Sequence, residues 1–468
     1  MNILAVLILL ILAFPFLSQA RNPNTMRNPK PNIIVIVSDD AGYADFGCYG
    51  NTTVKTPNID KLAASGVRFT SGYVSAAVCG PSRAGLMTGR YQQRFGYEVN
   101  NVPKAMDPSV GLQGEEMGLP LDQMTMADYM KMAGYTNMAA GKWHLGIADR
   151  YHPLQRGFDE FYGFLGGSRH YFPDVRDYAR KDNAVRRNHV KQSDFGYTTD
   201  GFTDAAIDFI RRHEKEKFFV YLAYNAVHTP LQAKEEDMQD YAFLKDKADR
   251  TFAGMIHSLD ENMGKLLTFL EKENLRENTL IFFINDNGGP SYVTPADNGP
   301  LSGCKGTHYE GGIRVPFIMS WPAVLPKNTE YDFPVISFDI LATMLAVTGV
   351  NERESTPLDG VDLIPYLTGK KKGRPHPTLF WREYITAAVR DGDWKLIRFP
   401  DKPAQLYNLA QDISEVHDLA TQRPDMVKSL YGKLWAWEQQ LARPLWFLQT
   451  KYDKQVVDKG KRFHKTEK

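Results

Sequence analysis

The strongest constraint on the fold is an alternation of short apolar runs with segments of helical periodicity. Residues 33–37, 218–224 and 280–284 are apolar runs bounded by polar or charged residues. Runs of this length are typical of strands that are buried on both faces of a sheet. Residues 205–213 and about 244–273 place apolar side chains near a 3.6-residue spacing, which predicts helices. We therefore predict an α/β fold with a large, mostly parallel sheet sandwiched by helices.

The same pattern continues through the rest of this region. Further helices are predicted at 59–64 (after Asn58 as a cap), 82–88 and 124–133, and further strands at 136–140 and 315–321. We assign residues 32–364 to this larger domain.

The alternation of buried strands and helices ends at about residue 365. Three short strand-like segments follow, at 378–382, 386–390 and 394–397, with Asp391-Gly392-Asp393 as a hairpin signal. An amphipathic helix is predicted at 425–441. Residues 365–450 are thus expected to form a smaller antiparallel sheet with a covering helix. Residues 451–468 are rich in lysine and poor in apolar side chains, and we expect them to be a mobile basic tail.

The N-terminus has the pattern of a signal peptide. Residues 3–17 are uninterruptedly apolar, and Ser18-Gln19-Ala20 offers the small residues that a signal peptidase recognises. The run is shorter than the roughly 20 residues of a membrane span. We predict a signal peptide at 1–20, a flexible lead-in at 21–31, export to the periplasm or the medium, and no stable membrane insertion after cleavage. Because no Lys or Arg precedes the apolar run, an uncleaved membrane anchor is the alternative.

Charge and cysteine content exclude some classes of protein. The net charge is +1, so the chain as a whole does not attract nucleic acid, and any preference for anions must be local to a site. The three cysteines, Cys48, Cys79 and Cys304, are too few for a disulfide scaffold. Cys48 and Cys304 can pair or remain free thiols, and their spacing does not decide between the two.

Acidic and amide side chains follow two of the predicted buried strands. Asp39 and Asp40 come after residues 33–37, and Asp286 and Asn287 come after residues 280–284. The carboxyl ends of parallel strands meet at one edge of a sheet, so these side chains should lie together. Their oxygens suit Ca²⁺ or Mg²⁺. The alternative is that they cap helices or lie in solvated loops.

The segment Cys79-Gly80-Pro81-Ser82-Arg83, with Leu86-Met87-Thr88-Gly89-Arg90 behind it, resembles the signature of the type I sulfatases of the alkaline-phosphatase superfamily. In that family a maturation enzyme oxidises the cysteine to Cα-formylglycine. The segments that also agree with the family pattern are 38–43, 141–146, 225–230, 305–307, 311–316 and 405–409. The resemblance covers about residues 30–440. Cys304 departs from it, because many relatives carry a small residue there.

The resemblance implies roles for individual residues. One Ca²⁺ would be held by Asp39, Asp40, Asp286 and Asn287 and would also touch residue 79, whose aldehyde hydrate would be the nucleophile. Arg83 would hold that hydrate and the ligand cluster.

The remaining implied roles concern the sulfate group and the protons. Lys142 and Lys305 would bind the sulfate oxygens. His228 would serve the leaving oxygen, and His144 would take the proton of the second hydroxyl of the hydrate. Taken singly, each of these residues can equally be a packing or solvated side chain.

The substrate class is narrowed by one further resemblance. Residues 89–97 are similar to a stretch of sulfatases that act on sulfated carbohydrates, and export favours a polymer-derived ester over a cytosolic metabolite. We expect a sulfated polysaccharide or oligosaccharide, with a galactose-based one as the narrower expectation. The candidates for a sugar-contacting rim are Trp143, Arg169, Tyr171 and Phe172, with ordinary packing as the alternative.

Two other functions are kept as alternatives. The first is a phosphonate or phosphate ester hydrolase that uses the same nucleophile. The second is a non-catalytic binder of sulfated glycans, although a binder has no need of a complete hydrolytic set of side chains.

Overall fold

The computed structural model describes residues 30–466. The predicted signal peptide and almost all of the predicted lead-in lie outside the described residues. Within the described part, no helix combines the length and the apolar character needed to cross a membrane.

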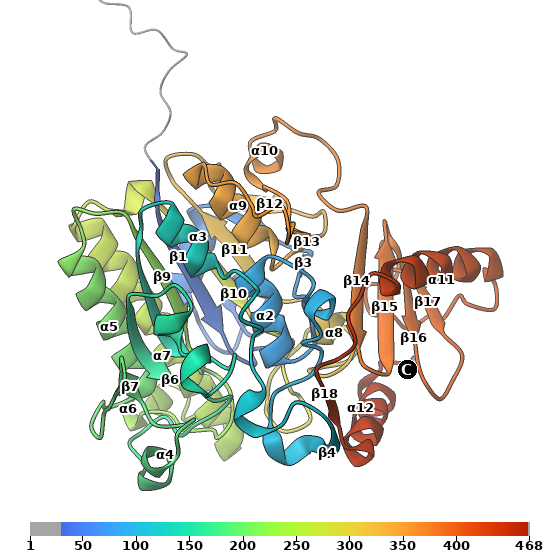
Figure 1. Ribbon diagram of the computed structural model, residues 1–468, viewed down its shortest axis with the longest axis horizontal. Coiled ribbons are helices and arrows are strands. Elements are labelled where there is room, and N and C mark those ends of the chain that lie inside the picture. Colours follow the sequence, from blue (N-terminus) through green and yellow to red (C-terminus); the bar gives the residue numbers. More distant parts are fainter. Residues whose placement is uncertain (1–29, 467–468) are drawn as a thin grey trace, which may run out of the picture.

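A twisted sheet forms the centre of the molecule (Figure 1). It has ten strands, in the order β12 (Thr329–Tyr331), β2 (Val67–Phe69), β11, β10, β1, β9, β5, β6, β7 and β8. Its middle is parallel and consists of β10 (Thr279–Asn285), β1 (Asn32–Ser38), β9 (Phe218–Ala223), β5 (Thr136–Lys142) and β6 (Glu160–Phe164). The predicted α/β fold is confirmed.

The sheet is mixed toward its edges. β11 (Phe317–Ser320) pairs antiparallel with β10. The chain between these two strands contains only the four-residue helix α8 (Glu310–Ile313), so no long crossover helix carries it back for a parallel pairing. On the opposite side, β7 (Arg186–Arg187) and β8 (Val190–Lys191) are also antiparallel.

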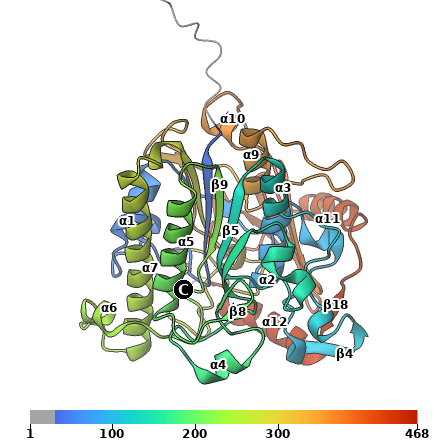
Figure 2. The same cartoon turned by 60° about the vertical axis from the view of Figure 1, so that its left-hand side comes forward.

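Helices cover both faces of the sheet, as the alternation in β1 requires. Ile34 and Ile36 belong to the core beneath α1 (Pro57–Ala64), α5 (Thr198–Arg212) and α7 (Lys247–Lys272). Ile33, Val35 and Val37 face the core beneath α2 (Cys79–Thr88), α3 (Met126–Met132) and α9 (Asp339–Thr348). Figure 2 shows the two groups of helices on opposite sides of the strands.

Helices α1 and α2 are among those that begin earlier than the sequence predicts. α1 begins at Pro57 with Thr56 at the N-cap, and the side chain of Asn58 instead donates to Asp260 at 2.8 Å. α2 begins at Cys79 and has Pro81 in its first turn. Proline is tolerated there because the N–H groups of a first helical turn have no partner within the helix. This start places Cys79 in the first turn of a buried helix.

The C-terminal part forms the predicted second sheet, which is antiparallel and has the order β14-β15-β16-β17. Its strands are β14 (Thr378–Glu383), β15 (Thr386–Asp391), β16 (Trp394–Arg398) and β17 (Gln405–Asn408). Helix α11 (Pro424–Glu438) packs on it through Leu430, Leu434 and Trp437. The same apolar core includes Tyr73 and Tyr309 of the larger part, so the two parts pack directly together.

The predicted mobile tail is wrong for the residues that the structure describes. Residues Thr450–Phe463 form helix α12. The backbone N–H of Gly303 donates to the carbonyl of Phe463 at 2.9 Å, and the His464 ring stacks on Tyr309 at 4.6 Å. These contacts hold the basic segment against the loop that contains Lys305.

The other elements are short. They are β2 (Val67–Phe69), β3 (Gly72–Tyr73), β4 (Met106–Gly111), β12 (Thr329–Tyr331), β13 (Val335–Ile336), β18 (Trp446–Leu448), α4 (Val175–Ala179), α6 (Glu235–Gln239) and α10 (Ile364–Leu367). The three cysteines are free thiols, so Cys48 and Cys304 do not pair.

Candidate active site

The carboxyl ends of β1 and β10 bring the predicted metal ligands together. The two strands pair in register up to Ser38 and Asn285, so the residues that follow emerge at the same level. Asn287 Nδ2 donates to Asp40 Oδ1 at 2.7 Å, and the backbone N–H of Asp40 donates to Asp286 Oδ1 at 3.4 Å. Asp40 itself has a φ of +65°, a left-handed conformation that Asp tolerates better than most residues.

Cys79 lies beside this cluster, at the start of α2. Its Sγ is 3.9 Å from Asp39 Oδ1, and Lys305 Nζ donates to it at 3.1 Å. Burial opposes ionisation of the thiol, but Lys142 and Lys305 outweigh that effect and lower the pKa of Cys79 to about 7. Position 79 is thus one where negative charge is stabilised by fixed cations.

Three cations balance the three carboxylates. Lys142 Nζ contacts Asp39 Oδ2 at 2.6 Å, and Lys305 Nζ contacts Asp40 Oδ1 at 2.6 Å. Arg83 is fully buried and donates from Nε and Nη2 to Asp286 Oδ2, at 2.9 and 2.8 Å. Buried charges of this kind are tolerated because each has a hydrogen-bonded partner.

The donor set fits a calcium ion. Asn287 Oδ1 is buried and has no hydrogen-bond partner within residues 30–466, which leaves it free to bind a cation. Ligand atoms of Asp39, Asp40, Cys79 and His228 all lie within 4.8 Å of one another. Carboxylate and amide oxygens are the ligands that Ca²⁺ prefers.

The two histidines of the site have opposite electrostatic surroundings. Burial, Lys142 and Arg83 hold the pKa of His144 well below its usual range. Burial also disfavours the charged form of His228, but Asp40 and Asp39 outweigh it and raise its pKa, and His228 Nε2 lies 3.5 Å from Asp40 Oδ2. These surroundings therefore favour the neutral form of His144, which a base requires, and the protonated form of His228, which an acid requires.

Neighbouring groups fix the positions of these histidines. Tyr97 Oη donates to the carbonyl of His144 at 3.1 Å, and His144 has a φ of +60°. A Cβ on Gly167 would lie 2.6 Å from His144 Nε2, so only glycine fits there without a shift. Tyr171 Oη lies 2.5 Å from the carbonyl oxygen of Asn225 and 2.8 Å from that of His228, and its one proton is shared between these acceptors, which fixes the loop that carries His228.

These groups open into a cavity of about 470 Å³, which we call the catalytic cavity. Cys79, His144, His228 and Lys305 line it, whereas Lys142 and Arg83 lie behind it. Its walls also contain residues that the sequence did not single out, namely Asn100–Lys104, Ile147, Leu165–Ser168, Arg180, Asp182 and Asn183. These lie mainly in loops, where no periodicity marks them, and the charged run at 180–182 is their only sequence signal.

The predicted sugar-contacting rim is not supported by the structure. Trp143 is a core residue whose Nε1 donates to the carbonyl of Tyr151, and Tyr171 is fully buried. Phe172 is partly exposed and packs on Tyr197, outside the catalytic cavity. Arg169 is buried and lines a separate pocket. Aromatic and arginine side chains occur both in packed cores and at sugar-binding surfaces, and the sequence alone does not distinguish these two roles.

The arrangement combines a nucleophile position, fixed cations, a site for a hard metal ion and an acid–base pair of histidines. Comparison with known proteins gives the same indication. The sequence model of the sulfatase family matches residues 31–350, and that of the C-terminal part of N-sulphoglucosamine sulphohydrolase matches residues 304–440. The chain belongs to the sulfatase family. It is a sulfuric ester hydrolase of the type I class, in agreement with the sequence resemblance.

Individual relatives agree with the family assignment. N-acetylgalactosamine-6-sulfatase of Canis lupus familiaris is 31% identical over 383 residues, which span 78% of this chain and 71% of the relative. The crystal structure of Ps i-CgsB has 36% sequence identity and a TM-score of 0.85, covering 93% of this sulfatase and 98% of the other chain. The same protein in complex with k-i-k-neocarrahexaose gives a TM-score of 0.84.

The fold alone does not distinguish a sulfatase from the alternative ester hydrolase. The phosphonate monoester hydrolase of Agrobacterium radiobacter shares the architecture, with a TM-score of 0.62 and 20% identity. The assignment of this chain therefore depends on the family match and the site, and not on the shape of the sheet.

Proposed function

We propose that this sulfatase hydrolyses sulfate esters of a galactose-based oligosaccharide or polysaccharide, with residue 79 as Cα-formylglycine and one bound Ca²⁺. The observation that carries the proposal is the position of Cys79, 3.1 Å from Lys305 Nζ and beside the carboxylates of two strand ends, in a cavity with both histidines. The sulfated-carbohydrate class is supported by the Ps i-CgsB complex and by the N-acetylgalactosamine-6-sulfatase relative.

The modified residue and the metal would supply chemistry that the thiol lacks. As a hydrated aldehyde, residue 79 supplies an oxygen nucleophile and a second hydroxyl, through which sulfate can leave without a second attack at sulfur. When bound by Asp39, Asp40, Asp286 and Asn287, Ca²⁺ supplies positive charge beside that nucleophile. Cys79 Sγ marks the place of the nucleophilic oxygen.

The other side chains of the site bind charge and move protons. Lys305 stabilises charge on the sulfate oxygens, with Lys142 adding to the positive potential behind it. As the ester S–O bond breaks, His228 donates a proton to the departing sugar oxygen. His144 then accepts the proton of the second hydroxyl. Arg83 holds Asp286 in place for the metal.

The pH profile should report the protonation of His228. Because Asp40 and Asp39 raise the pKa of His228 above its usual value, its acid form is present below that pKa and is lost as the pH rises through it. We expect kcat/KM on a sugar sulfate to fall on the alkaline side, and His228→Gln to remove that limb while lowering kcat/KM by roughly 10²- to 10⁴-fold. An aryl sulfate with a good leaving group should lose much less. Equal losses on both esters would argue against proton donation by His228.

Removal of calcium should lower both activity and thermal stability. At a Ca²⁺ concentration about 100 times the Kd, binding contributes roughly 2.7 kcal/mol, so a chelator should lower the Tm and added Ca²⁺ should restore it. Asn287→Ala removes the unpartnered buried oxygen and should raise the Ca²⁺ concentration needed for the shift. The control is Asp237→Asn, in the separate cluster of Asp237, His257 and Glu261, which should leave the Ca²⁺ dependence unchanged. A Tm that does not respond to chelation or Ca²⁺ would contradict the site.

The substrate class is tested with matured protein and paired esters. Sulfate release should occur from sulfated galactose oligosaccharides and from an aryl sulfate, and should exceed phosphate release from the matching aryl phosphate. Faster phosphate release would favour the phosphonate or phosphate ester hydrolase. Binding of sulfated oligosaccharide without any release would favour the glycan binder.

The proposal includes export and maturation. The chain would be directed to the periplasm or the medium by residues 1–20, and a formylglycine-generating enzyme would oxidise Cys79. Intact-mass measurement of protein from the native host reports both the cleavage and the oxidation. A mass that includes residues 1–20 would contradict the cleavage.

A further inference from the structure

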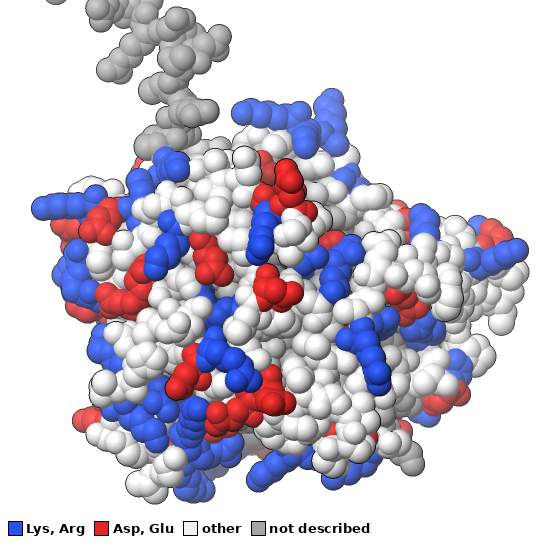
Figure 3. All heavy atoms as spheres, in the orientation of Figure 1, with Lys and Arg blue, Asp and Glu red and all other residues white. Residues whose placement is uncertain are grey.

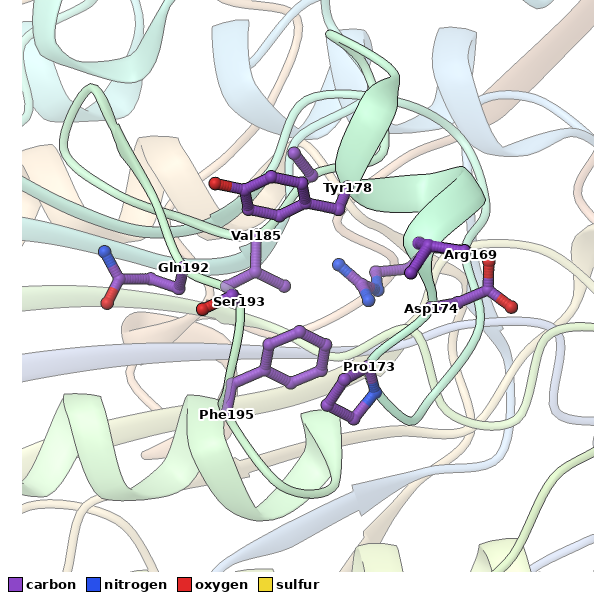
Figure 4. A pocket seen from close by; sticks show the side chains of 10 residues that line it. Arg169, Pro173, Asp174, Tyr178, Val185, Gln192, Ser193 and Phe195 are labelled. Carbon is purple, nitrogen blue, oxygen red and sulfur yellow. The ribbon is translucent and has the colours of Figure 1, made fainter.

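A second pocket lies beside the catalytic cavity and is separate from it. It has a volume of about 190 Å³ and is lined by residues of the 169–178 and 184–195 segments around α4 (Figure 4). The walls are largely apolar and include Val185, Phe195 and the ring of Tyr178, with Ser193 at an exposed position. This is smaller than the roughly 300–1,000 Å³ of pockets for drug-sized ligands, so the pocket suits one charged group and part of a sugar ring.

Arg169 supplies the only buried cation among the residues that line this pocket. Its side chain is anchored where Nε donates to the carbonyl of His170 at 2.7 Å and Nη1 donates to the carbonyl of Asn183 at 2.8 Å. Nη2 makes no hydrogen bond within residues 30–466. Arg169 is 3% exposed, and Figure 4 shows its guanidinium directed toward the middle of the lining side chains.

The nearby carboxylates are engaged by other groups. Asp177 accepts from the backbone N–H of His170 at 2.7 Å and from Asn183 Nδ2 at 2.9 Å. Asp174 accepts from Arg176 Nη2 at 2.7 Å, and Figure 4 shows its carboxylate turned away from the guanidinium.

Within the described part of the chain, Arg169 is therefore a buried cation without an ion-pair partner of its own. Burial lowers its pKa to about 10, which leaves the side chain charged at neutral pH. The Phe195 ring, 4.5 Å from the guanidinium carbon, compensates part of this charge through a cation–π contact. An oxyanion that accepts from Nη2 would supply the missing counter-charge.

We propose that this pocket, which we call the Arg169 pocket, binds a sulfate group of a sulfated sugar outside the catalytic cavity. An arginine N–H edge is suited to a sulfate oxygen, and Phe195, Val185 and Tyr178 offer apolar surface to the sugar ring. The identity of the ligand rests on the proposed function, because a sulfatase for sulfated saccharides meets sugars that carry sulfate groups.

The two cavities use neighbouring residues of the same two segments. Gly166, Gly167, Ser168 and Asn183 line the catalytic cavity, whereas Arg169 and Ala184 line the Arg169 pocket. A saccharide with several sulfate groups can therefore be held in the Arg169 pocket while another part of it is hydrolysed.

The test counts binding sites in a protein that cannot turn over. In a Cys79→Ala background, calorimetric titration with a monosulfated galactose, too short to bridge the two cavities, should give two bound molecules per chain. Adding Ser193→Trp should fill the Arg169 pocket and reduce the count to one, whereas Ser193→Ala should retain two. The Arg169→Met protein should also bind only one molecule. If Arg169→Met fails to fold, Ser193→Trp still tests the pocket, because it leaves both hydrogen bonds of Arg169 intact.

Several outcomes would overturn the proposal. A single bound molecule in the Cys79→Ala protein, unchanged by Ser193→Trp, would show that the Arg169 pocket takes no sulfated sugar. Equal binding of unsulfated galactose would show that the sulfate group is not recognised. Equal binding of inorganic sulfate at the Arg169 pocket would show that its ligand is a free anion and not a sulfated sugar. Since the titration needs no catalysis, failure of matured protein to release sulfate would count against the proposed function alone.

Discussion

Replacing Cys79 with alanine is expected to reduce sulfate release to background, a loss of roughly 10⁴- to 10⁶-fold in kcat. Alanine cannot be oxidised to an aldehyde, so no hydrate can form at the position 3.1 Å from Lys305 Nζ. The remaining lysines and histidines can bind the sulfate group but have no nucleophile to aim at sulfur. Serine at position 79 should be similarly inactive unless the host oxidises it.

The matched control is Cys48→Ala. Cys48 is a partly buried free thiol packed against the core on the α1 side of the sheet, and it is not part of the catalytic cavity. Its replacement should leave kcat/KM unchanged. Sulfate release by the Cys79→Ala protein at a rate near that of the parent would contradict the mechanism.

Replacing Lys395 with methionine is expected to destabilise the protein by about 3–5 kcal/mol. Lys395 Nζ lies 2.8 Å from Glu310 Oε1 and 2.9 Å from Glu415 Oε1, and all three side chains are fully buried. Glu310 belongs to α8 and Lys395 to β16, so the cluster joins the two parts of the molecule. Methionine fills the space but leaves two buried carboxylates without their shared cation.

The control for this variant is Lys433→Met. Lys433 pairs with Asp391 at 2.5 Å, but the two side chains are 43% and 29% exposed. Partly exposed ion pairs contribute roughly 0–1 kcal/mol, so the loss should be small. Urea unfolding of both variants measures the difference. Equal midpoints would show that the buried cluster does not stabilise the contact between the two parts.

The centre of the fold and the clustering of acidic side chains at its strand ends could be predicted because their signals are local. Residues 33–37 and 280–284 are apolar on both faces, as expected of a central strand that is covered on both sides. The acidic residues that follow these strands must lie at the same edge of a parallel sheet. The Cys79 signature is likewise contiguous, so it can be recognised in the sequence without knowledge of distant contacts.

Features that depend on distant contacts could not be predicted in the same way. The tail was expected to be mobile because its composition is polar, yet His464 stacks on Tyr309 and the chain there forms α12. In the sequence Trp143 is compatible with a sugar contact, whereas in the fold it packs edge-to-face against Phe158. The direction of β11 depends on the missing crossover helix, which the apolar pattern of the strand does not report.

Mass spectrometry of the peptide that contains residue 79, taken from active protein, tests the central claim most directly. We predict that this residue carries the aldehyde, which is lighter than the thiol, and that the rate of sulfate release rises in proportion to the aldehyde fraction across preparations. An active preparation in which residue 79 is entirely thiol would contradict the mechanism.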